Sequence, residues 1–192
     1  AAHGLRVTGV VGTEERLIGS FRYGAGVGEK SDVMLFGKLA QRDGGFPSTS
    51  GDRWDNNSVG MRFETALDEG VALTVDGLYH DSFIGDSYLS PPDVSSLNMI
   101  KGGHVKSRLR VDHAPDHWTE WRLAGDAYDQ DIRDYTANVN DFTLRYREEL
   151  FDTMLMHSLP VAPGHQLTAG IVLRSLTVEN FRLPAETGQE YN

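Results

Sequence analysis

Seven histidines make metal binding the first chemistry to consider for this sequence. His113 and His117 are four residues apart, a spacing that places two imidazoles on one face of a helix, but Pro115 lies between them and argues against a helix there. The other five histidines are dispersed and show no ligand spacing: His3, His80, His104, His157 and His165. We therefore expect no metal site and no cofactor.

Catalysis has little support from the residues either. Asp129 and Asp131 form a carboxylate pair of the kind used in hydrolysis, but carboxylates near loops are more often solvated. Segment 24–31, GAGVGEKS, differs from a phosphate loop because Glu29 precedes its lysine and no helical pattern follows. No serine lies in a nucleophile-elbow context. We expect that the chain is not an enzyme.

Composition narrows the class of protein. Apolar residues make up 39% and charged residues 24% of the 192 residues, which excludes a disordered chain. The net charge of −10 without a basic cluster argues against binding to nucleic acid. The absence of cysteine excludes disulfides and thiolate metal sites. No apolar run approaches the roughly 20 residues of a membrane helix, but an outer-membrane β-barrel remains compatible with this composition.

The elements that would position these side chains are strands, because apolar and polar residues alternate with a period of two. In 118–128, for example, Trp121 and Leu123 alternate with Glu120 and Arg122. The connections between strands alternate between short turns and the long segments 43–53, 83–101 and 131–147. The alternation of residues predicts nine strands, and a tenth strand near 136–146 is the alternative. The predicted strands are 4–12, 15–27, 31–42, 54–66, 70–82, 102–113, 117–130, 148–160 and 166–178.

Long strands with short turns at one end and long loops at the other are typical of outer-membrane barrels. We predict an all-β, antiparallel up-and-down meander of about nine to ten strands, forming part of a transmembrane β-barrel. Apolar side chains such as Val59, Phe63, Leu123, Ile171 and Leu173 would then face lipid. The opposite face would line a polar lumen and bind substrate through Arg62, Glu64, Arg108, Arg110, Glu120, Arg122 and Asp126.

Aromatic residues near strand ends fit this interpretation as anchors at the level of the lipid headgroups. The residues concerned are Trp54, Tyr79, Tyr88, Trp118 and Tyr128.

The chain also resembles a known family in an ordered series of segments. Residues 12–24, GTEERLIGSFRYG, look like the first barrel hairpin of TonB-dependent outer-membrane receptors. Residues 36–46, FGKLAQRDGGF, and 54–64, WDNNSVGMRFE, look like their next two strands, and the match continues at Gly102-Gly103, 118–128 and 164–174. The chain is identified on these segments as a partial barrel over residues 1–192, with no second domain.

The resemblance implies a receptor in the bacterial outer membrane for energised uptake of a scarce nutrient such as an iron chelate. Its partners would be outer-membrane lipid, the remaining barrel strands and plug, a periplasmic energy-coupling protein that acts through the plug, and a small-molecule ligand. The chain departs from the family in having no plug, only nine strands and a last residue, Asn192, that is not aromatic. A small self-contained outer-membrane barrel and a soluble all-β binding module are the alternatives. In the partial barrel, segments 4–12 and 166–178 would not pair.

Overall fold

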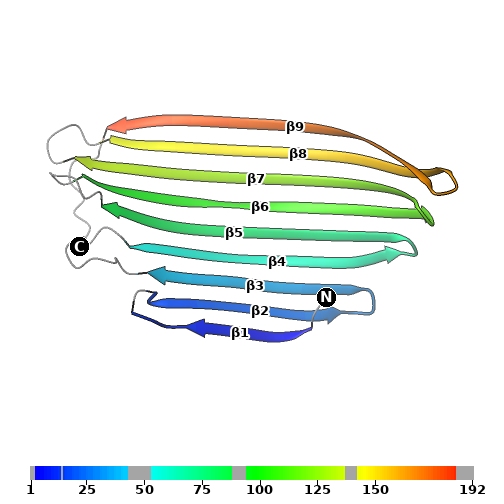
Figure 1. Cartoon of the computed structure of the whole chain (residues 1–192), viewed down its shortest axis with the longest axis horizontal. Coiled ribbons are helices and arrows are strands. Elements are labelled where there is room, and N and C mark those ends of the chain that lie inside the picture. Colours follow the sequence, from blue (N-terminus) through cyan, green and yellow to red (C-terminus); the bar gives the residue numbers. More distant parts are fainter. Residues whose placement is uncertain (1–2, 14, 43–52, 88–93, 137–141, 185–192) are drawn as a thin grey trace.

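The computed structural model describes residues 3–13, 15–42, 53–87, 94–136 and 142–184. They form one antiparallel sheet in which each strand pairs with the next along the chain (Figure 1). The part of the chain that the structure describes contains no helix long and apolar enough to cross a membrane. The strands are β1 (Gly4–Val10), β2 (Leu17–Val27), β3 (Ser31–Arg42), β4 (Trp54–Asp68), β5 (Val71–Ser87), β6 (Val94–Ala114), β7 (His117–Thr136), β8 (Phe142–Ala162) and β9 (His165–Pro184).

The predicted all-β meander is therefore confirmed, with nine strands in the described residues. The predicted long loops 83–101 and 131–147 are wrong, because β5 extends to Ser87, β6 begins at Val94, β7 extends to Thr136 and β8 begins at Phe142. A separate tenth strand near 136–146 is wrong for the same reason, and residues 137–141 lie outside the described part. The strands continue to pair through residues in which apolar and polar side chains no longer alternate. The alternation therefore locates part of each of these strands but does not predict where the strand ends.

The register of the sheet separates odd-numbered from even-numbered residues. Outside the bulges, every registered pair joins two odd or two even residue numbers, from Leu5 opposite Tyr23 to Leu155 opposite Ile171. Because successive side chains in a strand point to opposite faces, one face of the sheet carries odd-numbered residues and the other carries even-numbered residues. We call these the odd face and the even face.

The two faces differ as the sequence predicted. Leu123, with the other residues predicted to face lipid, lies on the odd face, whereas Arg122 and the other predicted lumen residues lie on the even face. Of the aromatic residues predicted as anchors, Trp54, Trp118 and Tyr128 lie on the even face and Tyr79 lies on the odd face, whereas Tyr88 lies outside the described residues. Their role as anchors at the lipid headgroups stays a prediction. The alternation of residues along a strand determines on which face of the sheet a side chain lies, whereas nearness to a strand end does not.

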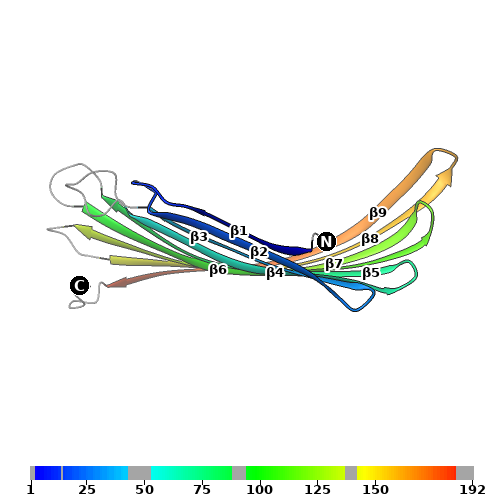
Figure 2. The same ribbon diagram turned by 90° about the horizontal axis from the view of Figure 1, so that it is seen from below.

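The sheet is a single curved layer (Figure 2). Ala40 is the one buried hydrophobic residue among those described. The buried polar residues Ser82, Glu120 and Ser158 all lie on the even face, which indicates that side chains crowd one another more on that face. Within the described ranges, the sheet therefore has no apolar core of the kind that a second layer would create.

The sheet is also open. β1 pairs only with β2 and β9 only with β8 within the described residues, so the predicted absence of pairing between the first and last segments is confirmed. Each of these outer edges presents backbone groups on which a further strand would pair.

Candidate functional site

The odd face carries an apolar band that crosses all nine strands. Its side chains are largely exposed: Trp121 is 46% exposed, Val105 61% and Ile171 66%. We define the apolar band by the following residues: Leu5, Val7, Phe21, Tyr23, Val33, Leu35, Val59, Met61, Phe63, Leu73, Val75, Tyr79, Val105, Leu109, Trp121, Leu123, Phe151, Leu155, Leu167, Ile171 and Leu173.

The apolar band ends in a row of charges on the side of the long connections. The register places one charged residue of the odd face on each of five neighbouring strands, with alternating sign, and we call this set the rim row. Its members are Asp81, Lys101, Asp129, Arg147 and Glu179. Opposite charges directly across a strand pair stabilise the pairing, so the members of the rim row attract each other. Glu149, which pairs with Arg147 at 2.6 Å, lies one odd-face position nearer the short turns, and Phe83 and Met99 lie beyond the row.

Asp129 is the best-connected residue of the rim row. The Nη2 atom of Arg145 donates to Asp129 Oδ2 at 2.6 Å, and Arg145 Nε lies 3.7 Å from Asp131 Oδ1. This hydrogen bond, with smaller contributions from the charges of Arg147 and Lys101, holds the pKa of the Asp129 carboxyl below its usual range. The carboxylates Asp129 and Asp131, considered above as a hydrolytic pair, are thus engaged by one guanidinium.

The even face carries charged residues along the same stretch of strand in which the odd face is apolar, together with apolar ones such as Phe36 and Val172. Arg62 and Glu64 form an ion pair at 2.6 Å, and Arg122 Nε donates to Glu120 Oε1 at 2.5 Å. Glu120 is only 2% exposed, and Arg110 lies opposite it in the register. These residues were all predicted from the sequence, and the structure brings them onto one face.

Two groups on the even face lack the partners that buried polar atoms need. Arg62 Nε and Asp76 Oδ2 are buried and have no hydrogen-bond partner within the described part of the chain, and the two residues lie opposite each other on β4 and β5. Arg108 and Arg122 lie directly opposite each other on β6 and β7, where like charges repel. Water or a polar solute on this face would supply hydrogen-bond partners to Arg62 Nε and Asp76 Oδ2. A bound anion would reduce the repulsion between Arg108 and Arg122.

A polar and aromatic cluster extends the even face toward the long connections. The hydroxyl of Tyr128 donates to Gln130 Oε1 at 3.1 Å, and Gln130 Nε2 donates to Asn98 Oδ1 at 3.0 Å. The Tyr146 hydroxyl donates to Glu148 at 2.5 Å, and the rings of Tyr128 and Tyr146 meet edge to face at 6.1 Å. The sequence did not predict this cluster because its members come from three strands. Along β7 and β8 they also alternate with charged residues of the odd face.

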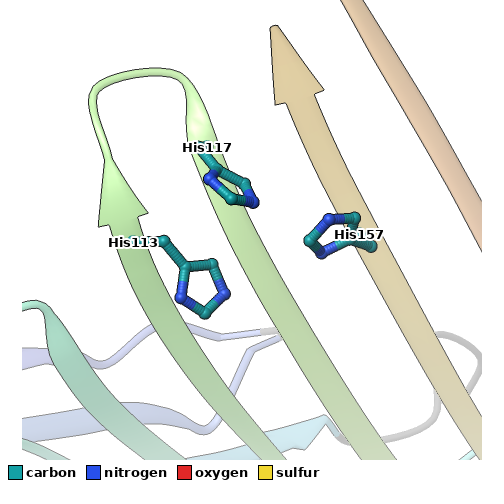
Figure 3. Close-up of side chains that lie close together, drawn as sticks. All are labelled: His113, His117 and His157. Atoms are coloured by element: carbon teal, nitrogen blue, oxygen red, sulfur yellow. The ribbon is translucent and has the colours of Figure 1, made fainter.

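The odd face carries a second polar group at the opposite end of the apolar band, beside the short turns. The rings of His113, His117 and His157 come from β6, β7 and β8 and lie together just below the β6–β7 turn (Figure 3). Their ring centroids are 4.7, 5.1 and 6.2 Å apart, and Thr119 Oγ1 is hydrogen-bonded to His113 Nε2 at 2.8 Å and to His157 Nδ1 at 2.9 Å. The prediction that His157 stands apart from the other two is wrong, because the β7–β8 register places it opposite Thr119.

No family model, no curated protein and no solved structure matches the chain. The functional argument therefore rests on the chemistry of the two faces.

Proposed function

We propose that the chain forms part of a β-barrel in the bacterial outer membrane, with the odd face toward lipid and the even face toward a polar lumen. The observation that carries the proposal is the apolar band, which runs across all nine strands and contributes to no apolar core within the described residues. A water-soluble sheet buries such a face against a second layer. Lipid covers it in a membrane barrel, where charges and water occupy the other face.

The height of the band supports this assignment. The stretch of β7 from Thr119 to Asp129 measures roughly 33 Å at about 3.3 Å per residue. With the strand tilt of about 40° found in such barrels, it spans about 25 Å along the membrane normal, so the rows of Thr119 and Asp129 would lie at the two edges of a lipid-facing band of the usual height. The rim row and the histidine cluster then lie at the two polar boundaries.

The even face supports a role in transport. Its ion pairs and its unpartnered buried polar atoms suit a wet surface, and the opposed arginines Arg108 and Arg122 favour a solute with negative charge. Together with the resemblance noted above, this favours a TonB-dependent receptor that takes up a scarce nutrient such as an iron chelate. In that assembly further strands and a plug would complete the barrel at the open edges of β1 and β9, and a periplasmic energy-coupling protein would act through the plug.

The test is quenching of tryptophan fluorescence by brominated lipid. Trp54, Trp118 and Trp121 are replaced by Phe, and one new tryptophan is introduced by Leu123→Trp on the odd face or by Ala124→Trp on the even face. The two positions are neighbours at the same depth, so depth alone cannot separate them. We expect strong quenching for Leu123→Trp and weak quenching for Ala124→Trp in vesicles.

Two outcomes count against the proposal. Equal quenching at both positions would contradict a lipid-facing odd face, and no quenching at either would favour a soluble protein. Transport is tested separately, with reconstituted full-length receptor: loss of ligand binding in Arg108→Gln or Arg122→Gln is expected, whereas Arg145→Gln on the odd face serves as the control.

A further inference from the structure

We propose that His113, His117 and His157 form a binding site for one divalent transition-metal ion, with Zn²⁺ as the best-suited ion. Each histidine offers one ring nitrogen such that the three nitrogens all lie within 4.8 Å of one another. Neutral imidazole is a preferred ligand of Zn²⁺, and three histidines with an open fourth position are an established ligand set. The inference does not depend on whether lipid or water contacts the odd face.

Two of the three rings meet at the hydroxyl of Thr119, and the third lies beside them. His113 and His157 both direct a ring nitrogen at the hydroxyl of Thr119, from β6 and β8, while His117 contacts both rings. An ion beside this hydroxyl would have three nitrogen ligands, and Thr119 Oγ1 or water would complete four-coordination. At Zn–N distances of 2.0–2.1 Å the nitrogens of a tetrahedral site are about 3.3 Å apart, so the rings must approach further. His113 is exposed, and its ring neighbours are the other two histidines and Thr119, the groups that would share the ion with it.

His113 is the extra residue of a β-bulge, and the same kind of bulge occurs at two other turns of the sheet. β4–β5, β6–β7 and β8–β9 all have a bulge just before the short turn, and the extra residue is Leu67, His113 and Val161 respectively. Leu67 is 55% and Val161 56% exposed. A bulge re-aims the side chain of its extra residue, and only this one of the three turns places a metal ligand at that position.

The surroundings of the cluster attract cations. A hollow beside His113 is lined by the carboxylates Glu69, Asp112 and Asp116, with Gly70 of the neighbouring turn held against Asp112 by a backbone hydrogen bond of 2.7 Å. Arg110 Nε donates to Asp112 Oδ1 at 2.9 Å and offsets the charge of that carboxylate. Glu69 and Asp116 are therefore the carboxylates that would raise the local concentration of divalent cations, without being required as ligands. A bound ion would connect three strands, β6, β7 and β8, at the end of the sheet where the short turns lie.

The experiment is a Zn²⁺ titration of the 192-residue chain, folded in detergent and freed of metal by dialysis against a chelator. The variants are His157→Gln and His117→Gln, and the control is His165→Gln, which removes an exposed histidine of the adjacent β9 that lies outside the cluster. We expect one Zn²⁺ per chain for the native protein and for His165→Gln, and affinity at least about tenfold lower for the two cluster variants. Bound Co²⁺ should give the visible absorption of a four-coordinate site.

A measurement on the native chain makes the test independent of how the variants fold. Zn²⁺ should protect His113, His117 and His157 from modification by diethyl pyrocarbonate, and leave His3 and His165 reactive. The proposal is overturned if the native chain shows no saturable Zn²⁺ binding at about 100 µM, a level that occupies any site of micromolar affinity. It is also overturned if His165→Gln weakens binding as much as His157→Gln, or if all histidines are protected alike.

Discussion

The arrangement of the two faces predicts a large difference between two neighbouring positions on β7. Leu123 lies on the odd face and Ala124 on the even face, close to the middle of the stretch between Thr119 and Asp129. Leu123→Arg places a charge at the midplane of the proposed bilayer, which costs roughly 2–4 kcal/mol for arginine on the lipid face of a barrel. About 3 kcal/mol corresponds to a change of more than a hundredfold in the equilibrium constant of folding.

Ala124→Arg is the matched control. Its neighbours in the register are Lys106 on β6 and Asp152 on β8, so the new guanidinium meets one charge of each sign on a wet face. We expect a cost below about 1 kcal/mol, as for exposed charged groups.

Urea-dependent folding into lipid vesicles measures both variants, with the free energy of unfolding taken from the midpoint and slope of each titration. Equal costs for Leu123→Arg and Ala124→Arg, to within about 0.5 kcal/mol, would refute the lipid-facing assignment of the odd face. A larger cost for Ala124→Arg would reverse the two faces.

Two further predictions concern packing and charge. Gly103→Ala should destabilise the sheet by about 1–3 kcal/mol, because its new Cβ would lie 2.4 Å from the backbone oxygen of Leu78. A Cβ at Gly125 would have nothing within 4 Å, so Gly125→Ala should be neutral or slightly stabilising. Urea titration of the two variants distinguishes these outcomes. Arg145→Gln should raise the pKa of Asp129, which lies beyond the apolar band, toward its usual value, as followed by NMR titration of the carboxyl. Since the native pKa of Asp129 is lowered, its stabilising contribution is present above the unfolded-state pKa and is lost as the pH falls through the folded-state pKa. An unchanged pKa in Arg145→Gln would contradict this account.

The sequence predicted the strands and the two faces because both depend on local alternation. Trp121 and Leu123 differ from Glu120 and Arg122 in polarity, and a strand must put these pairs on opposite faces. The ends of the strands were predicted less well: β6 begins at Val94, well before the predicted residue 102, because its first residues pair without alternating in polarity.

The sequence could not predict contacts that depend on the register between strands. His157 lies forty residues beyond His117 in the chain, and only the β7–β8 register brings it opposite Thr119. His113 joins them through the bulge between Asp112 and Ala114, which no feature of the sequence specifies by itself. The carboxylates and cations of the rim row were equally hidden, since each occupies a different strand.

The placement of charge on the odd face bears on the proposed lipid boundary. In a soluble sheet with one face in water, charged residues on that face have no reason to begin at the same register row on neighbouring strands. Here one charged residue of each strand from β5 to β9 lies in the same row, from Asp81 to Glu179. The exception is Glu149, which pairs with Arg147 at 2.6 Å and lies one odd-face position nearer the short turns. The even face has charges such as Arg108 and Glu120 at the height where the odd face has Leu109 and Trp121. A row of charges shared by five strands on the odd face is what the proposed bilayer edge on that side would favour.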